Sequence, residues 1–198
     1  MKKIIFYGDS NTYGYDPMGF STRMRYPEEF RWTTKVRKYF KNKYDIIEEG
    51  KNGRLIPLLP NESKFVEKLT KNLVHGDMLF VMLGTNDILV ADYPNANIAI
   101  QKMKFLIDWF LKKIMKSNLF IIGPVPMPSK FEDTPEYHNE NVKMNSGFKT
   151  ICMESGIKCF DAGAWGIALA CDGIHFSQEG HQKFANHIID VINCCQNY

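Results

Sequence analysis

The amino-acid sequence predicts an α/β protein, a three-layer α/β/α sandwich built around a five-stranded parallel sheet. Short apolar runs alternate with helical patterns along the chain, as they do when helices connect parallel strands. One run, residues 77–83, is almost wholly apolar, which is typical of a strand covered on both faces. The chain has 198 residues and shows no internal repeat or linker, so we expect one domain over residues 1–198.

The first half of the chain predicts strands and helices in alternation. Residues 3–7 are a β-rich run that ends in Gly-Asp-Ser, which indicates a strand meeting a turn. Residues 27–40 suit a helix, because a proline and two acidic residues come first and the basic residues come late. Residues 44–48 are a second strand candidate. Residues 61–73 form a helical pattern for which Asn61 is a suitable N-cap.

The second half continues the alternation beyond the apolar strand. Large apolar residues recur every three or four positions in residues 97–115, which predicts a helix. Residues 119–122 form another apolar strand, and residues 139–154 form a weakly patterned helix with a glycine inside it. Residues 157–160 are the fifth strand. Residues 177–194 are the last helix, with a serine at its N-cap.

Composition argues against several classes of protein. Hydrophobic residues make up 44% and charged residues 24%, which is ordinary globular usage and not that of a disordered or coiled-coil chain. The formal net charge is only +3, and the densest basic run, residues 35–43, has apolar members at helical spacing. We interpret the basic residues of this run as the solvent-exposed face of an amphipathic helix, so no nucleic-acid partner is expected.

Cysteine usage and hydropathy indicate a cytoplasmic protein. The five cysteines are odd in number and form no CxxC pair, so we expect free thiols, mostly as small buried hydrophobes. The first apolar run ends at Gly8 and is too short for a secretory signal. No apolar run approaches the ~18 residues that a membrane span needs, so no membrane partner is expected either.

Two loops at predicted strand ends hold groups that serve nucleophilic catalysis. In open α/β sheets, ligands bind outside the carboxyl ends of the strands. Ser10 follows the first strand, and a serine becomes nucleophilic when a base is close by. Asp172 and His175 share the loop before the last helix, where the acid can hold the imidazole in a productive tautomer. Taken alone, each is more simply explained by local structure, with Ser10 as a turn or N-cap serine, Asp172 as a surface acid and His175 as a capping histidine.

Two further loops hold candidate donors for an oxyanion. Asn86 follows the most apolar strand and can present its amide to a developing negative charge. Gly53 can expose a backbone N–H that a substrate approaches closely. Asn-Asp and Asn-Gly are also ordinary turn sequences. Together the four loops supply a nucleophile, a base, an orienting acid and oxyanion donors, which is the set that acyl transfer at a serine requires.

Four sequence blocks resemble the SGNH (GDSL-like) hydrolase family, which is named for four residues in four such blocks. The resemblance covers nearly the whole chain and implies the flavodoxin-like fold of that family. In chain order, the blocks are GDSNTYG at residues 8–14, EGKNGR at 49–54, LGTND at 83–87 and DGIHF at 172–176.

The arylesterase/acyltransferase branch of the family is the more similar one. Arg31-Trp32, Glu48-Glu49-Gly50 and Asp161-Ala162-Gly163 all look like that branch. Two positions depart from the family pattern: Asn11 stands where many members carry leucine, and Asn52 stands where serine is common. The long insertion that builds large oligomers in some members is not recognised, which argues against transferase activity and a large assembly. Family habit favours a homodimer.

The resemblance implies a serine esterase with the catalytic residues Ser10, Asp172 and His175. Ser10 would attack the ester carbonyl, His175 would carry the proton and Asp172 would orient His175. The backbone N–H groups of Ser10 and Gly53 and the side chain of Asn86 would bind the oxyanion. No metal and no organic cofactor is needed, and the five histidines show no paired ligand spacing.

We expect the substrate to be a small ester, and the sequence does not identify its acyl chain or its alcohol. Absence of a continuous apolar helix face favours short acyl chains, as in acetylated carbohydrates or small aryl esters. Thioesters or lysophospholipids in the same site are an alternative. A non-catalytic flavodoxin-like binding module is another, although no phosphate-binding loop follows the first strand. The four-proline loop at residues 124–137 is expected to be mobile or to face the substrate. The candidate pocket residues are Tyr13, Tyr15, Arg54, Ile88, Val125 and Ile174.

Overall fold

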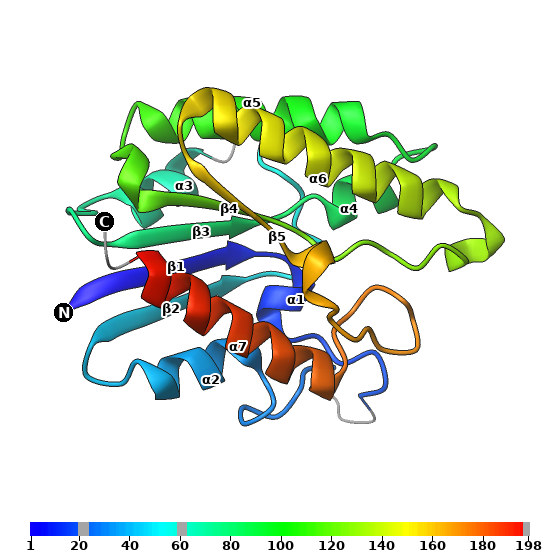
Figure 1. The fold of residues 1–198 in the computed structure, drawn as a ribbon, viewed down its shortest axis with the longest axis horizontal. Helices are drawn as coiled ribbons and strands as arrows, with labels where there is room; N and C mark the ends of the chain where they lie inside the picture. Colours follow the sequence, from blue (N-terminus) through cyan, green and yellow to red (C-terminus); the bar gives the residue numbers. More distant parts are fainter. Residues whose placement is uncertain (20–23, 59–62, 196–198) are drawn as a thin grey trace.

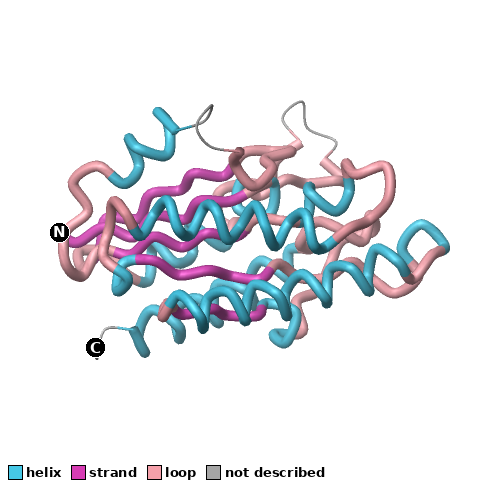
Figure 2. The backbone as a smooth tube through the Cα atoms, turned by 90° about the horizontal axis from the view of Figure 1, so that it is seen from above, coloured by secondary structure: helices cyan, strands magenta, loops and turns pink. Residues whose placement is uncertain are grey.

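A five-stranded parallel sheet lies between two layers of helices (Figure 1). The structure, a computed structural model, describes residues 1–19, 24–58 and 63–195. All neighbouring strand pairs are parallel, and Figure 2 shows the strands side by side beneath the helices. The five predicted strands are confirmed, with ends shifted by one or two residues. In spatial order they are β2 (Tyr44–Gly50), β1 (Lys2–Gly8), β3 (Met78–Met82), β4 (Leu119–Gly123) and β5 (Lys158–Asp161).

The burial of the strands matches their sequences. Every residue of β3 and β4 is buried, as expected of apolar strands covered on both faces. β2 lies at one edge and keeps Asp45 exposed. Because β2 and β3 lie on opposite sides of β1, the chain leaves β1 and β2 in opposite directions across the sheet. Such a reversal opens a crevice at the carboxyl ends of the strands.

Two groups of helices cover the two faces of the sheet (Figure 1). Helices α3, α5 and α6 share one apolar cluster with the sheet, and α2 and α7 share the other. In the second cluster the ring of Trp32 lies 4.7 Å from that of Phe6 and 4.8 Å from that of Phe184. The longer helices are α2 (Trp32–Tyr39), α3 (Ser63–Thr70), α5 (Ala96–Leu111), α6 (Glu136–Ser155) and α7 (Gln178–Cys195).

The predicted helices are confirmed, but several boundaries were wrong. Helix α2 begins at Trp32 and not at Pro27, because the chain first makes a turn in which Phe30 N–H donates to the Pro27 carbonyl. Helix α5 ends at Leu111, before the predicted residue 115. Two short helices, α1 (Ser10–Tyr13) and α4 (Thr85–Leu89), were read as loops. Both come soon after a strand and are too short to show a periodic pattern of apolar residues.

Two local expectations about helices can be compared with the structure. The glycine inside α6, Gly147, does not interrupt the helix. A Cβ there would lie 2.2 Å from Cδ1 of Ile100, so the glycine allows α6 to approach α5. Ser177 does cap α7, since its Oγ accepts the N–H of Gly180 at 3.0 Å. The predicted N-cap Asn61 lies outside the described residues.

The cysteines follow the prediction only in part. All five are free thiols. Cys152 is buried in the core as expected, but Cys171 and Cys194 are exposed. Among the described residues, no helix combines the length and apolar character that crossing a bilayer would require.

Candidate active site

The first helix places Ser10 directly after β1. Asp9 caps α1 by accepting the N–H of Asn11 at 3.0 Å, and Ser10 is the first helical residue. The helix lies close to the ends of two strands, because a Cβ on Gly8 would be 2.0 Å from Oγ1 of Thr12, and one on Gly50 would be 2.2 Å from the nitrogen of Tyr13. Burial raises the pKa of Asp9 to about 7.

Ser10, His175 and Asp172 form a chain of hydrogen bonds across the ends of β1 and of the segment that follows β5. Nε2 of His175 lies 2.9 Å from Oγ of Ser10. Nδ1 of the same ring lies 2.5 Å from Oδ2 of Asp172. Oδ1 of Asp172 accepts the backbone N–H groups of Ile174 and His175, each at 3.0 Å. The carboxylate therefore binds both the ring and the backbone of the histidine.

The electrostatics of Asp172 suit a role as the partner of a histidine. Partial burial opposes ionisation, but the hydrogen bonds from the His175 ring and from the two backbone N–H groups outweigh it. The pKa of Asp172 is therefore held below its ordinary value. An ionised carboxylate accepts the Nδ1 proton, so the unprotonated Nε2 faces Ser10. That tautomer can take the hydroxyl proton.

An aromatic ring lies on the histidine. The centroid of the Tyr15 ring is 4.4 Å from that of His175. Tyr15 was among the residues that the sequence placed beside the site. The neighbouring Tyr13 lies differently, since the guanidinium of Arg25 stands 4.0 Å above its ring and pairs with Glu48 of β2.

The loop after β2 brings Gly53 and Asn86 to the same part of the molecule. Gly53 has φ +69°, a backbone conformation that favours glycine, and a Cβ there would meet nothing within 4 Å. Nδ2 of Asn86 donates a hydrogen bond of 3.1 Å to the carbonyl of Arg54, the residue after Gly53. Because an amide carries two N–H groups, this bond leaves one for a ligand.

A buried ion pair between Asp87 and Lys102 supports this loop, and it could not be predicted from the sequence, where Asp87 reads as part of an Asn-Asp turn. Oδ2 of Asp87 accepts the N–H of Ile56 at 2.9 Å, and Oδ1 lies 2.8 Å from Nζ of Lys102. Burial raises the pKa of Asp87, and the bonds from Lys102 and Ile56 oppose that rise. The pair joins α4 and α5 to the loop that carries Gly53.

Of the remaining candidate pocket residues, Ile88 is contradicted by its burial, while Arg54, Val125 and Ile174 stay predictions. The guanidinium of Arg54 donates to the carbonyls of Gly8 and Glu49, so it joins the ends of β1 and β2. Ile88 is fully buried in the core and offers no surface to a substrate, which corrects its prediction as a pocket wall. Val125 and Ile174 are half-buried and pack against the two apolar clusters.

The four-proline loop is anchored by hydrogen bonds, which argues against a mobile segment, while its prediction as a substrate-facing segment stays a prediction. Nδ2 of Asn145 donates to the carbonyl of Pro124 at 2.8 Å, and Oδ1 of Asn141 accepts the N–H of Met127 at 3.1 Å. A Cβ on Gly173 would lie 3.2 Å from Cδ of Pro128. Helix α6 thus holds this loop against the segment that carries His175.

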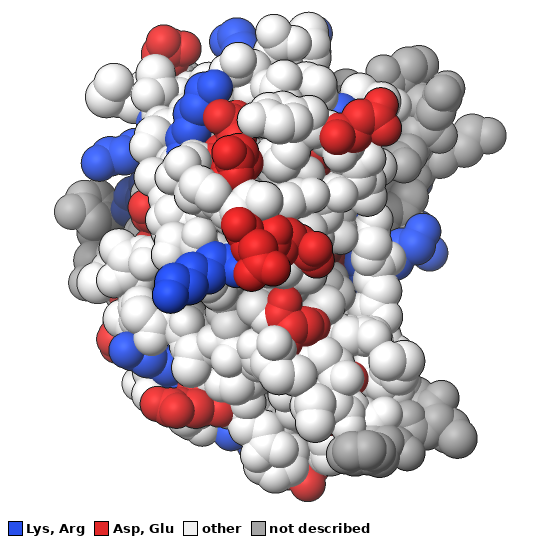
Figure 3. Space-filling model, turned by 90° about the vertical axis from the view of Figure 1, so that its right-hand side faces the viewer, with Lys and Arg blue, Asp and Glu red and all other residues white. Residues whose placement is uncertain are grey.

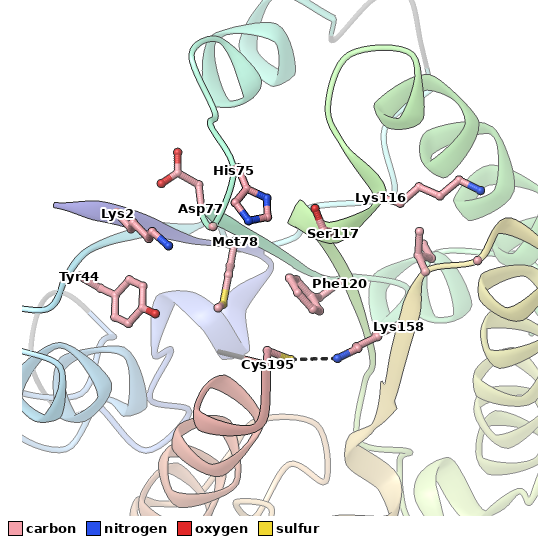
Figure 4. A pocket seen from close by; sticks show the side chains of 13 residues that line it. Lys2, Tyr44, His75, Asp77, Met78, Lys116, Ser117, Phe120, Lys158 and Cys195 are labelled. Carbon is pink, nitrogen blue, oxygen red and sulfur yellow. Dashed lines mark hydrogen bonds between the residues drawn. The ribbon is translucent and has the colours of Figure 1, made fainter. Parts of the chain in front are cut away.

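A cavity of about 530 Å³ lies at the amino ends of the strands, opposite the end that carries Ser10 (Figure 4). It is lined by the first residues of several strands, whereas Ser10 and Asn86 follow the carboxyl ends of strands. Its size alone therefore does not make it the active site. Among its lining residues are Lys2, Tyr44, His75, Met78, Phe120 and Lys158.

The face at the carboxyl ends of the strands carries no broad basic patch on its described part. Figure 3 shows acidic side chains gathered near the middle of this face, with single basic side chains around them. The described residues also contain no cluster of three or more histidine, cysteine or acidic side chains that could hold a metal ion.

Comparisons with known proteins agree with the fold and with the family that the sequence resembles. Residues 6–183 match the model of the GDSL-like lipase/acylhydrolase family. A carbohydrate acetylesterase from Sinorhizobium meliloti is 24% identical, with a TM-score of 0.80 over 98% of this chain and 99% of its own. An aryl esterase from M. smegmatis is 21% identical, with a TM-score of 0.78 over 98% of this chain and all of its own. These two likenesses show the fold.

One curated relative is much longer than the chain. An N-acylneuraminate cytidylyltransferase from Escherichia coli is 24% identical over 124 residues. The match covers 59% of this chain and 28% of that protein.

Proposed function

Since the chain belongs to the GDSL-like lipase/acylhydrolase (SGNH) family, we propose that it is a carboxylic ester hydrolase. It would hydrolyse short-chain esters with Ser10 as nucleophile, His175 as general base and Asp172 as orienting acid. The observation that carries this proposal is the unbroken chain from Oγ of Ser10 through the His175 ring to Asp172. Its two distances, 2.9 and 2.5 Å, are those of hydrogen bonds.

The proposed first half-reaction acylates Ser10. As Oγ attacks the ester carbonyl carbon, its proton passes to Nε2 of His175. The tetrahedral intermediate carries one negative charge on the former carbonyl oxygen. When the intermediate collapses, the bond to the alcohol oxygen breaks, and His175 returns the proton to the leaving alcohol. An acyl-enzyme on Ser10 remains.

The second half-reaction uses the same groups with water as nucleophile. His175 takes a proton from water, the hydroxide attacks the acyl-enzyme, and Ser10 leaves with the proton from His175. Asp172 stays ionised throughout and stabilises the imidazolium form. Tyr15 lies against this ring, and an aromatic face next to a developing cation is also favourable.

The oxyanion would be bound by the backbone N–H groups of Ser10 and Gly53 and by the side chain of Asn86. The positive φ and the open space at Gly53 support this role. So does the single bond of the Asn86 amide to the Arg54 carbonyl, because the amide keeps a second N–H. Removing one such donor typically costs about 3–4 kcal/mol of transition-state stabilisation.

We further propose that the substrate is an acetyl ester of a carbohydrate or a small aryl ester. The structural relatives include a carbohydrate acetylesterase and an aryl esterase, and the longer curated relative is named for an N-acylated sugar acid. A series of p-nitrophenyl esters with acyl chains of increasing length tests the short-chain preference. A thioester or lysophospholipid hydrolase would instead favour its own substrate class over every ester in the series.

The deciding experiment is active-site labelling with a fluorophosphonate probe, followed by intact-mass analysis and peptide mapping. We expect one adduct on Ser10 in the wild-type protein and none in a folded Ser10→Ala variant. The same variant should lose nearly all esterase activity. An unlabelled, folded wild-type protein, or unchanged turnover in Ser10→Ala, would refute the assignment.

A further inference from the structure

Asn11 joins the nucleophile helix to the backbone on both sides of His175. Its side chain is buried, with 6% of the residue exposed, at the second position of α1. Nδ2 donates to the carbonyl of Ile174 at 3.1 Å, and Oδ1 accepts the N–H of Phe176 at 2.8 Å. One amide therefore satisfies the peptide groups that flank the histidine.

The other bonds of His175 do not supply this connection. The bonds from Asp172 to the ring and to the backbone N–H groups all lie within residues 172–175, so they shape the loop and leave its distance from Ser10 undetermined. The bond between His175 and Ser10 does cross from the loop to the helix, but it is the one that must rearrange during proton transfer. Asn11 makes the crossing bonds that stay intact.

Asn11 is itself held in place by its main chain. Its N–H donates to Oδ1 of Asp9 at 3.0 Å, and its carbonyl accepts Nε1–H of Trp32 at 2.9 Å. Trp32 is buried in the apolar cluster between α2 and α7. The side-chain bonds of Asn11 therefore connect the His175 loop to a residue that is itself fixed to the core through Trp32.

We propose that Asn11 is a positioning residue, which sets the Ser10–His175 distance by binding the peptide groups before and after the histidine. The proposal rests on the function proposed for Ser10 and His175. Only a side chain with a donor and an acceptor at this length can make both bonds. Leucine has a similar size and can make neither.

The test separates positioning from simple stabilisation with a matched pair of variants. Asn11→Leu removes both side-chain bonds to the histidine loop. Phe110→Leu, at a fully buried position of α5 on the other face of the sheet, lowers stability and changes no group that bonds to Asn11. For each variant we would measure kcat and KM on p-nitrophenyl acetate, the rate of fluorophosphonate labelling, and the melting temperature.

We expect Asn11→Leu to lower kcat and the labelling rate by about tenfold or more, because sub-ångström misplacement of a catalytic group is costly. KM should stay within about twofold of the wild-type value. Phe110→Leu should melt earlier and keep both kcat and the labelling rate. Equal labelling of Asn11→Leu and the wild type would overturn the proposal, and so would an equal loss of kcat in both variants.

A third variant keeps the test decisive if Asn11→Leu does not fold. Asn11→Asp at pH 8 retains an oxygen for the N–H of Phe176 and loses the donor to Ile174. A kcat below that of the wild type with unchanged KM supports the proposal, and wild-type kcat overturns it. A wild-type protein that is neither labelled nor active points to failure of the proposed function and not of the role of Asn11.

Discussion

The two halves of the site are held together in different ways. The half with the proposed triad consists of Ser10, Asp172 and His175, which are linked directly by hydrogen bonds through the His175 ring. The oxyanion half consists of the Gly53 loop and Asn86, which are joined by the bond from Asn86 to the Arg54 carbonyl and supported from behind by the Asp87–Lys102 pair. In one half the functional groups position each other, whereas in the other they depend on residues that touch no substrate.

This difference predicts how substitutions in each half should affect activity and stability. In the triad half, a change to one member should remove the chemistry and leave the fold intact, since the bonds lie near the surface of the crevice. In the oxyanion half, a change to a supporting residue should lower both activity and stability, because the support is a buried charge pair. The following variants test that contrast, from the largest expected effect to the smallest.

Asp172→Asn should have the largest effect among these variants. An asparagine amide can donate to Nδ1, which would turn the imidazole into the wrong tautomer and present a protonated Nε2 to Ser10. We expect kcat to fall by about 10,000-fold with little change in melting temperature. Steady-state kinetics and thermal unfolding measure both. A loss below about tenfold would show that another group orients His175.

Asn86→Ala should come second. Loss of one oxyanion donor is expected to lower kcat by about 100- to 1,000-fold, while KM changes little, because the bond forms in the transition state. Steady-state kinetics on p-nitrophenyl acetate separates the two constants. An effect confined to KM would place Asn86 in substrate binding instead. Asn97→Ala, which alters an asparagine of α5 away from the site, serves as the control.

Lys102→Met should have a smaller and mixed effect. It leaves the carboxylate of Asp87 buried without its cation, so we expect a loss of about 1–3 kcal/mol of unfolding free energy and a kcat about tenfold lower. Urea unfolding and kinetics measure the two together. Adding Asp87→Asn should restore part of both, since the new amide oxygen can still accept the N–H of Ile56. Lys104→Met, at an exposed position of the same helix, is the control. Wild-type stability with reduced kcat would contradict the supporting role.

His181→Phe should change pH dependence more than activity. His181 is fully buried behind the triad loop, with its ring centroid 5.5 Å from that of Phe176 and 5.1 Å from that of Tyr26. Burial, with help from Lys35 and Arg31, lowers the pKa of His181 to about 3. The unfolded chain therefore binds a proton that the folded chain does not, between about pH 6.5 and 3.

The sign of that effect is fixed by the lowered pKa. Stability from the neutral His181 is complete above about pH 6.5 and declines as the pH falls, by at most about 1.4 kcal/mol per pH unit. His181→Phe should flatten this decline in urea unfolding measured from pH 7 to 4. His187→Phe controls for a new phenyl ring on the same helix. An unchanged slope in His181→Phe would assign the acid sensitivity to other groups.

Much of the fold could be predicted because the strands are short apolar runs with polar ends. Strand β3 is the clearest case, since a run of this kind has few alternatives to a doubly covered parallel strand. Helix starts were harder, and Pro27 shows why. A proline followed by acids suits a first helical turn, but in the structure it begins a separate turn ahead of Trp32.

Site residues could be proposed from the sequence where the chemistry requires a particular residue type. They could not be proposed where the role depends on contacts that form only in the folded chain. Ser10 and His175 could be proposed from the sequence because a nucleophile and a base have few chemical substitutes, and the structure brings them within 2.9 Å. Asn11 and Asp87 were not found, because asparagine after serine and aspartate after asparagine are ordinary turn residues in a sequence. Their roles depend on partners at residues 174, 176, 56 and 102, which only the folded chain brings near.

The separation of Ser10 and His175 along the chain has a consequence for synthesis. The two residues are 165 positions apart, and the segment that brings the base follows the last strand. A growing chain therefore contains the proposed nucleophile long before the proposed base is synthesised. The proposed triad therefore assembles only after residue 175 has been synthesised, and the onset of activity would report the docking of the His175 loop on α1.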